Sequence, residues 1–309
     1  MASATLLAQT LRPLTVRPRQ HPRGLDHVSA ASGLVCAHGR AYVVCDDEHH
    51  LAVFDDAQRP GTLHRLLHGD LPPDAVERKR RKADFEALLL LEGYPTHGAQ
   101  ALVALGSGST PQRDTGVALV LDGQGRPTKD LCRFSLTALY QPLRSALGEI
   151  NIEGAFLQGD ELVLLHRGGQ GGADNAVLRL QRAQLVAAIG GRGGIGPAPE
   201  ITHLALGALD GVPLGFTDGA ALSGGGWVFC AAAEDTQDSY ADGACAGGAV
   251  GVVNAAGELT ALHRLASLHN THQKPEGIAV RERRDGLDLC LVTDADDPAR
   301  AAELLLARL

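Results

Sequence analysis

The chain has 309 residues, 44% of them hydrophobic and 21% charged, and its formal net charge is −8. This hydrophobic content is enough for a packed core and excludes intrinsic disorder over most of the chain. The acidic balance argues against a surface built to bind nucleic acid or an anionic membrane, so we expect neither partner.

The sequence offers no segment that would take the chain into or across a membrane. No run approaches the ~20 apolar residues of a membrane-spanning helix, and residues 1–22 lack the apolar centre of a secretory signal. We therefore expect a cytoplasmic protein. The six cysteines form no C-x-x-C pair, and we expect them to be small buried residues, not disulfides or zinc ligands.

In chain order, an apolar strand over residues 5–11 precedes five segments that share one pattern. In each segment a small or acidic residue comes before Gly or Ala, a short apolar strand, a turn and a second strongly apolar strand. Self-similarity of this kind, with a period of roughly 60 residues, indicates a repeat architecture. The anchors of the five repeats are Ser32, Glu86, Glu153, Asp218 and Glu276.

A third apolar run follows in every repeat and a fourth in the first four, and four strands per repeat are typical of a propeller blade. The fifth repeat stops after its third strand, so the N-terminal strand is expected to complete the last blade. We predict one domain over residues 1–309, an all-β five-bladed β-propeller. Six blades are the alternative if residues 57–82 or 182–200 contain further strands. Only Ala138–Leu147 and Ala183–Ile189 look helical, which argues against a two-domain α/β protein.

Four of the five anchors are acidic: Glu86, Glu153, Asp218 and Glu276. They precede inward-facing apolar strands, where an unpaired buried charge costs several kcal/mol. Two explanations are open. The carboxylates converge on a hard cation such as Ca²⁺, or each accepts N–H groups of the neighbouring blade and locks the blades together.

Other polar residues supply further candidates for the mouth of the predicted channel. Arg167 ends the second strand of its repeat, where it either neutralises the acidic ring or binds an anionic group bidentately. His50 and His272 are candidates for a general base. The basic run 78–82 predicts a solvated loop, or else a site for a polyanion or phosphorylated substrate.

Three short motifs, 82–88 (KADFEAL), 151–155 (NIEGA) and 274–279 (KPEGIA), are followed in the last case by 291–297 (LVTDADD). They resemble blade motifs of bacterial phytase-like propellers, the "esterase-like activity of phytase" proteins, and of a similar uncharacterised bacterial propeller family. A more distant likeness is to six-bladed lactonase-type propellers. The resemblance implies a calcium-associated propeller that hydrolyses phosphate or carboxylate esters. Phytases carry clusters of Lys and Arg around the acidic site, whereas Arg167 is the only strand-end cation here.

The sequence thus predicts a monomeric bacterial propeller whose acidic channel binds a divalent cation, Ca²⁺, and a small anionic molecule or ester. If the protein is an enzyme, the expected reaction is metal-assisted hydrolysis of an ester, phosphoester or lactone. The alternative is a non-enzymatic propeller that binds a ligand or another protein, in which the acidic ring only locks the blades.

Overall fold

Apolar strands joined by turns build nearly all of the molecule, and the prediction of an all-β protein is confirmed. A computed structural model describes residues 4–55, 59–169, 175–192, 196–235, 244–267 and 274–309. Its strands form three sheets of four strands and one sheet of nine.

Each four-stranded sheet is a simple antiparallel succession of strands that are consecutive in the chain. The first contains β2 (Ala31–Ala37), β3 (Arg40–Cys45), β4 (His50–Phe54) and β5 (Thr62–Arg65). The second contains β6 (Phe85–Glu92), β7 (Gln100–Gly106), β8 (Thr115–Leu121) and β9 (Pro127–Ser135). The third contains β10 (Ile152–Gln158), β11 (Glu161–His166), β12 (Ala176–Gln181) and β13 (Glu200–His203).

The nine-stranded sheet joins the two ends of the chain. Its order is β14 (Ala208–Leu209), β15 (Val212–Ala221), β16 (Trp227–Asp235), β17 (Ala244–Val253), β18 (Leu259–Ser267), β1 (Ala4–Pro13), β21 (Glu303–Arg308), β20 (Gly286–Thr293) and β19 (Pro275–Arg283). Strand β1 pairs antiparallel with β21, as predicted for the N-terminal strand, and parallel with β18. The second pairing was not predicted, and it merges two antiparallel runs of strands into one sheet.

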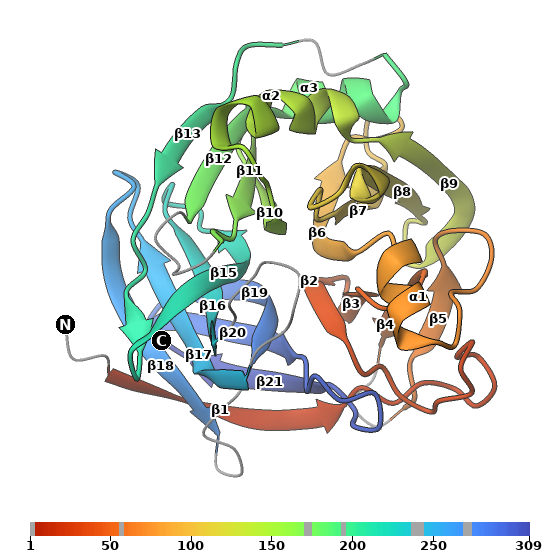
Figure 1. Ribbon diagram of the computed structural model, residues 1–309, viewed down its shortest axis with the longest axis horizontal. Coiled ribbons are helices and arrows are strands. Elements are labelled where there is room, and N and C mark those ends of the chain that lie inside the picture. Colours follow the sequence, from red (N-terminus) through yellow and green to blue (C-terminus); the bar gives the residue numbers. More distant parts are fainter. Residues whose placement is uncertain (1–3, 56–58, 170–174, 193–195, 236–243, 268–273) are drawn as a thin grey trace.

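The sheets stand side by side around a common centre, with one strand of each run innermost (Figure 1). Strand β2 contacts β6, β6 contacts β10, β10 contacts β15, β15 contacts β19, and β19 returns to β2. The contacts between inner strands therefore close into a ring. Clusters of Leu, Val, Ala and a few aromatic side chains fill the spaces between neighbouring sheets.

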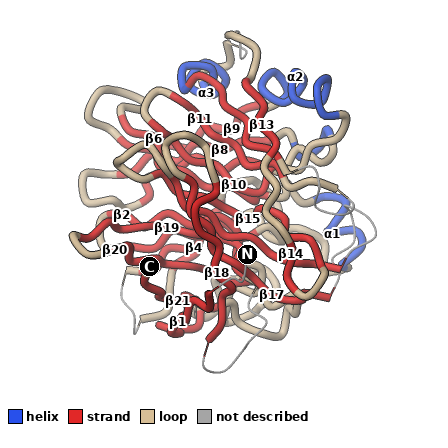
Figure 2. Tube along the Cα trace, turned by 90° about the vertical axis from the view of Figure 1, so that its left-hand side faces the viewer, coloured by secondary structure: helices blue, strands red, loops and turns tan. Residues whose placement is uncertain are grey.

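Among the described residues, three short α-helices lie at the periphery of the strands (Figure 2), and a single 3-10 turn, η1 (Pro111–Arg113), precedes β8. α2 (Thr137–Leu147) and α3 (Arg182–Ile189) coincide with the two predicted helical segments, whereas α1 (Ala75–Arg81) was not predicted. Asp74 caps α1 by accepting a hydrogen bond from the backbone N–H of Glu77 at 2.9 Å. None of the helices in the described ranges has the length and apolar character needed to cross a bilayer.

Glycine allows the inner strands to approach one another closely. A Cβ atom added at Gly33 of β2 would lie 2.5 Å from the backbone nitrogen of Leu88 in β6. Because that contact is with backbone, no side-chain rotation relieves it. A side chain at position 33 would therefore push β2 and β6 apart.

We predict that Gly33→Ala lowers the free energy of unfolding by about 1–3 kcal/mol, the usual cost of overpacking. Denaturant unfolding followed by circular dichroism measures the change. Gly123→Ala is the matched control, because nothing lies within 4 Å of a Cβ added at that turn position. Equal stabilities for the two variants would contradict a close contact between the inner strands.

Candidate functional site

Each inner strand shifts its pairing register once, close to its start in four strands and in the middle of the strand in β15. A β-bulge of this kind places extra residues in one strand and re-aims their side chains. The shifts fall between Ala31 and Leu34, Phe85 and Ala87, Ile152 and Gly154, Phe216 and Asp218, and Pro275 and Gly277. The predicted repeat anchors therefore mark a real structural irregularity that recurs around the ring.

Glutamate occupies the bulge in three of these strands, at Glu86, Glu153 and Glu276. In β15 the bulge residue is Thr217, and Asp218 takes the place of the glycine that follows the glutamate in two other repeats. The sequence alignment of the repeats is therefore wrong by one residue in the fourth repeat. The Asp-Gly pair in β15 has the same sequence pattern as the Glu-Gly pairs of the other repeats, but it lies one residue later relative to the bulge.

Asp218 binds backbone groups of two inner strands. Its Oδ1 accepts a hydrogen bond from the N–H of Gly219 at 2.8 Å, and its Oδ2 accepts one from Ile278 of β19 at 2.9 Å. Thr217 donates its hydroxyl to the carbonyl of Pro275 at 2.7 Å. Burial raises the pKa of Asp218 well above its usual range, although these N–H groups act in the opposite direction. This arrangement is the one expected of a residue that locks β15 to β19.

Glu153 and Glu276 are also buried, and each has a polar partner on its own strand or just before it. The side-chain amide of Asn151 donates to Glu153 Oε1 at 2.5 Å, and Lys274 Nζ lies 3.2 Å from Glu276 Oε1. Burial raises the pKa of Glu153 to about 8 and that of Glu276 to about 7. Near neutral pH, the carboxyl groups at the centre of the ring therefore include protonated as well as ionised forms.

Arg167 neutralises a carboxylate. Its Nη2 donates to Glu234 Oε2 at 2.7 Å, and its side chain is only 17% exposed. Lys274 lies 2.8 Å from the other oxygen of Glu234 and 2.7 Å from Asp296 Oδ1. Glu234 is not one of the four acidic anchors, and both roles predicted for Arg167 stay predictions.

A second group of acids lies where β3 ends and β6 begins. Oxygen atoms of Asp46, Asp84 and Glu86 all lie within 4.8 Å of one another, and we call these three residues the carboxylate cluster. Burial, followed by repulsion from Asp84 and Asp46, raises the pKa of Glu86 well above its usual range. Oxygen atoms so arranged suit a hard divalent cation.

The cluster also has internal counter-ions. Lys82 pairs with Asp46 and lies 2.7 Å from Asp84 Oδ1, while Arg113 lies 2.8 Å from Asp84 Oδ2. Ser107 donates its hydroxyl to the same Oδ2 at 2.5 Å. Asp84 itself has a φ of +57°, a conformation that non-glycine residues seldom adopt and that recurs at binding and catalytic sites.

The cluster adjoins a polar cavity of about 450 Å³, which we call the mouth cavity. Basic and acidic side chains both line it, among them Arg23, Asp46, Arg78, Lys82, Asp294 and Asp296. Asp296, like Asp84, has a positive φ, of +51°. Burial raises the pKa of Asp294 well above its usual range. The cavity thus combines four cationic side chains, those of Arg23, Arg78, Lys79 and Lys82, with several carboxyl groups, one of which, Asp294, tends to keep its proton.

The basic run beside this cavity is not the solvated loop that its composition predicts. Most of it forms α1, and Arg78 turns inward, where its Nη1 lies 3.1 Å from Glu48 Oε1. Lys82, directly after the helix, reaches the carboxylate cluster. The prediction was wrong because a charge run that pairs with buried acids has the same composition as one that faces water.

The structure describes one of the two candidate general bases, His50. His50 lies buried in β4 and is not among the residues that line the mouth cavity. Burial, followed by the charge of Arg65, lowers its pKa to about 4. His272 lies outside the described residues.

Sequence reasoning named only Glu86 among the three residues of the carboxylate cluster as a metal ligand. Asp84 belongs to the motif over residues 82–88, and Asp46 directly follows β3. The Lys-x-Asp-x-Glu spacing of 82–86 is a signal for Asp84 and Glu86, whereas nothing in the spacing of the sequence places Asp46 beside them.

The family profile described as "Family of unknown function (DUF6929)" matches residues 27–309. The chain belongs to the DUF6929 family. A comparison with curated proteins found no match. Membership does not name an activity, so the phytase-like activity implied by the sequence motifs is a matter for experiment.

Solved structures that resemble this DUF6929 chain do so at a distance. The tail fibre of Staphylococcus aureus phage P68 has a TM-score of 0.48 and 10% identity over 98% of this chain, which spans 53% of that fibre chain. A glycoside hydrolase family 43 arabinoxylan arabinofuranohydrolase from Bacillus subtilis has a TM-score of 0.48 and 10% identity over 96% of this chain and 66% of its own. The α-L-arabinanase of Cellvibrio cellulosa has a TM-score of 0.46 and 10% identity, covering 91% of this chain and 92% of its own.

We predict that Asp218→Asn destabilises the protein by about 2 kcal/mol, since an amide has one acceptor oxygen for two backbone donors. Thermal and urea unfolding measure the loss. Asp160→Asn, at an exposed position, is the control. A variant as stable as the control would show that Asp218 does not lock β15 to β19.

His50 generates a prediction of pH dependence. Its folded pKa of about 4 lies below its ordinary value of 6.5, so the unfolded chain binds the proton more readily. The stability contributed by neutral His50 is therefore present above about pH 6.5 and is lost as the pH falls toward 4. The loss is on the order of 3 kcal/mol at most.

Urea unfolding at a series of pH values between 4 and 7 tests this prediction. In His50→Gln the fall in stability toward pH 4 should be smaller than in the wild type, whatever the effect of the substitution at pH 7. His68→Gln, at an exposed position, is the matched control. Parallel pH curves for His50→Gln and the wild type would contradict the prediction.

Proposed function

We propose that this DUF6929 protein is a single-domain, five-bladed β-propeller that binds Ca²⁺ at the carboxylate cluster and hydrolyses an ester, phosphoester or lactone in the mouth cavity. Two observations support five blades. Five inner strands close the ring of contacts. Strands β1 and β18, which are parallel, divide the nine-stranded sheet into two antiparallel runs. Each run then corresponds to one blade, with β1 as the outer strand of the last.

The close approach of Asp46, Asp84 and Glu86 is the observation that carries the proposal of a cation. Three carboxylates face one lysine and one arginine there, and burial, followed by repulsion from Asp84 and Asp46, raises the pKa of Glu86. A divalent cation bound there would take the place of the proton on Glu86. Asp46 and Asp84 would then contact both the cation and their basic partners, Lys82 and Arg113. When bound, Ca²⁺ would supply a Lewis acid that polarises a carbonyl or phosphoryl oxygen.

The chain's own residues would bind and orient the substrate. Arg78 and Lys82, on the wall formed by α1 and the residue after it, suit an anionic substituent beside the scissile bond. Asp294, which also lines the cavity, has a pKa raised by burial and is suited to protonate the leaving oxygen. This division of roles favours small anionic esters over neutral ones.

The alternative is that the acids only lock the ring, in a propeller that binds a ligand or protein without catalysis. Asp218 favours it, because its carboxylate bonds to backbone N–H groups. The two proposals divide the four acidic anchors differently. Under the first, Glu86 binds the cation together with Asp46 and Asp84, and Glu153 and Glu276 are further ligands to test.

We predict that Ca²⁺ at about 100 times its dissociation constant stabilises the protein by about 2.7 kcal/mol, and that EDTA reverses the shift. Isothermal titration calorimetry of the EDTA-treated chain gives the affinity directly. Glu86→Gln should weaken binding at least tenfold, because the cation loses a charged ligand. Glu149→Gln, which removes an exposed carboxylate, is the matched control.

The same preparations distinguish an enzyme from a binding protein. Hydrolysis of p-nitrophenyl acetate, p-nitrophenyl phosphate and a small lactone would be measured with Ca²⁺ and with EDTA. Activity that needs Ca²⁺ and is lost in Glu86→Gln would support a hydrolase. Ca²⁺ binding without turnover would favour the non-enzymatic alternative, and no binding by either method would sink the cation site. Monomeric state and cytoplasmic location are further predictions, open to light scattering and fractionation.

A further inference from the structure

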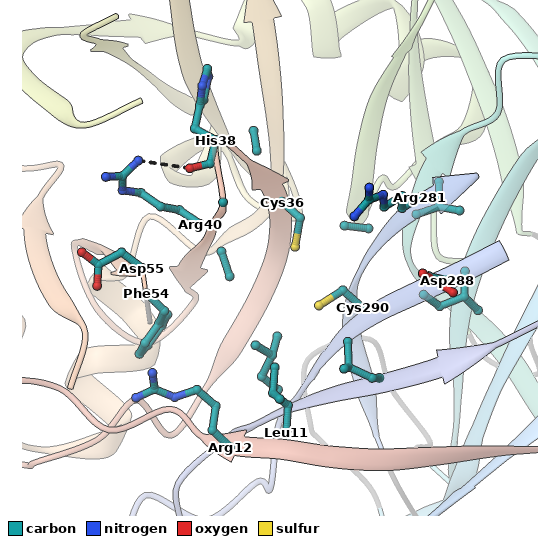
Figure 3. A pocket seen from close by; sticks show the side chains of 18 of the residues that line it. Leu11, Arg12, Cys36, His38, Arg40, Phe54, Asp55, Arg281, Asp288 and Cys290 are labelled. Carbon is teal, nitrogen blue, oxygen red and sulfur yellow. Dashed lines mark hydrogen bonds between the residues drawn. The ribbon is translucent and has the colours of Figure 1, made fainter. Parts of the chain in front are cut away.

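A second cavity, of about 640 Å³, lies at the opposite end of β2 from the mouth cavity. Strands β2, β3, β19, β20 and β21 border it, so it lies between the first sheet and the last run of strands. Two of its lining residues are Cys36 of β2 and Cys290 of β20. Figure 3 shows their sulfur atoms pointing toward one another across this space.

The register of the strands accounts for this arrangement. A Cβ added at Gly277 would lie 2.8 Å from the Cβ of Leu34 in β2 and 2.7 Å from Cγ2 of Val292 in β20. These two side chains are therefore neighbours between the sheets. Because side chains return to the same face of a strand every second residue, the next neighbours in line are Cys36 and Cys290.

The two thiols differ from the cysteines of the core. Cys36 is exposed and Cys290 is half-buried, whereas Cys45 and Cys230 are fully enclosed. The expectation of six buried cysteines is therefore wrong for Cys36. A hydrogen bond between the two thiols raises the pKa of Cys36 and lowers that of Cys290. Of the two thiols, Cys290 is therefore the one that loses its proton more readily.

The cavity around the thiols is rich in positive charge. Four arginines line it, Arg12, Arg40, Arg281 and Arg283, against two aspartates, Asp55 and Asp288. Arg283 is paired with Asp288 at 2.6 Å, and the side chain of Arg40 donates to the carbonyl of Gln124 at 2.6 Å. The excess of arginine favours a thiol-reactive molecule that carries carboxylates.

We propose that Cys36 and Cys290 form a redox-active dithiol, which a small anionic disulfide such as glutathione disulfide oxidises to an intramolecular disulfide. The thiolate of Cys290 attacks one sulfur of the small disulfide, the S–S bond breaks, and one glutathione thiolate leaves. The thiolate of Cys36 then attacks the sulfur of Cys290 and releases the second glutathione. The two protons lost by the protein thiols pass to the two leaving thiolates, so the protein is oxidised by two electrons and the reagent is reduced by two.

The new bond would tie β2 of the first sheet to β20 of the last run of strands. In the described part of the chain these elements meet through side-chain packing, through the contact of β2 with β19 and β20, and through a β-bridge between Ala30, just before β2, and Asp294, just after β20. A covalent link between parts so distant in sequence restricts the unfolded chain and should raise the melting temperature of the oxidised protein.

The native full-length protein, first reduced and desalted, would be incubated with glutathione disulfide. Peptide mapping without reduction should find residues 36 and 290 cross-linked, and two of the six thiols should become resistant to alkylation. Cys290→Ser and Cys36→Ser should each abolish the cross-link, with Cys36→Ser accumulating a glutathione adduct at Cys290. Cys132→Ser, which removes a half-buried thiol elsewhere, should behave as the wild type.

A second reagent tests the charge argument. Cystamine carries the same disulfide between two ammonium groups, and it should oxidise the pair several-fold more slowly than glutathione disulfide at low ionic strength. Glutathione adducts on Cys36 or Cys290 without a cross-link would overturn the dithiol. Equal or faster oxidation by cystamine would overturn the preference for an anionic reagent.

Discussion

Buried negative charge at the start of the inner strands is the constraint around which the centre of the molecule is organised. Bulges place the side chains of Glu86, Glu153 and Glu276 in the interior of the ring. Isolated carboxylates there would cost several kcal/mol each. The protein offsets this cost by the ion pair of Lys274 with Glu276, by the amide hydrogen bond from Asn151 to Glu153, by the nearby charges of Lys82 and Arg167, and by retained protons.

These compensating interactions differ from one repeat to the next. The difference distinguishes a candidate site from residues that only hold the scaffold together. On the side of β15 and β19, Asp218 is satisfied by backbone and Glu276 by Lys274. On the side of β3 and β6, three carboxylates crowd one lysine and one arginine beside an open cavity. A ligand without rotational symmetry requires such a difference between otherwise equivalent repeats.

The repeated pattern allowed the strands, the pairing of β1 with β21 and two of the three helices to be predicted, because alternation and turn residues act locally. The centre of the ring could be predicted only in part. Asp218 was aligned one residue away from the bulge of its strand. A bulge is defined by pairing with the neighbouring strand, and the amino-acid sequence does not show that pairing. α1 was not predicted, because the basic run was expected to face water. What turns Arg78 inward is its buried partner Glu48, which lies thirty residues earlier in the chain. Asp46 and Asp84 meet only once β3 and β6 are placed side by side.

Strand β2 runs between the two cavities at the place where the ring of inner strands closes. At one end β2 enters beside the mouth cavity, and at the other its Cys36 faces Cys290. Between them, the backbone of β2 lies against Gly277 at the junction of the first and last sheets, where a β-bridge between Ala30 and Asp294 also joins the two. Any change in how tightly this junction is held acts on the strand that leads from one cavity to the other. A disulfide at Cys36 would therefore fix the position of β2, and with it Asp46 at the end of its partner β3, beside the carboxylates of β6.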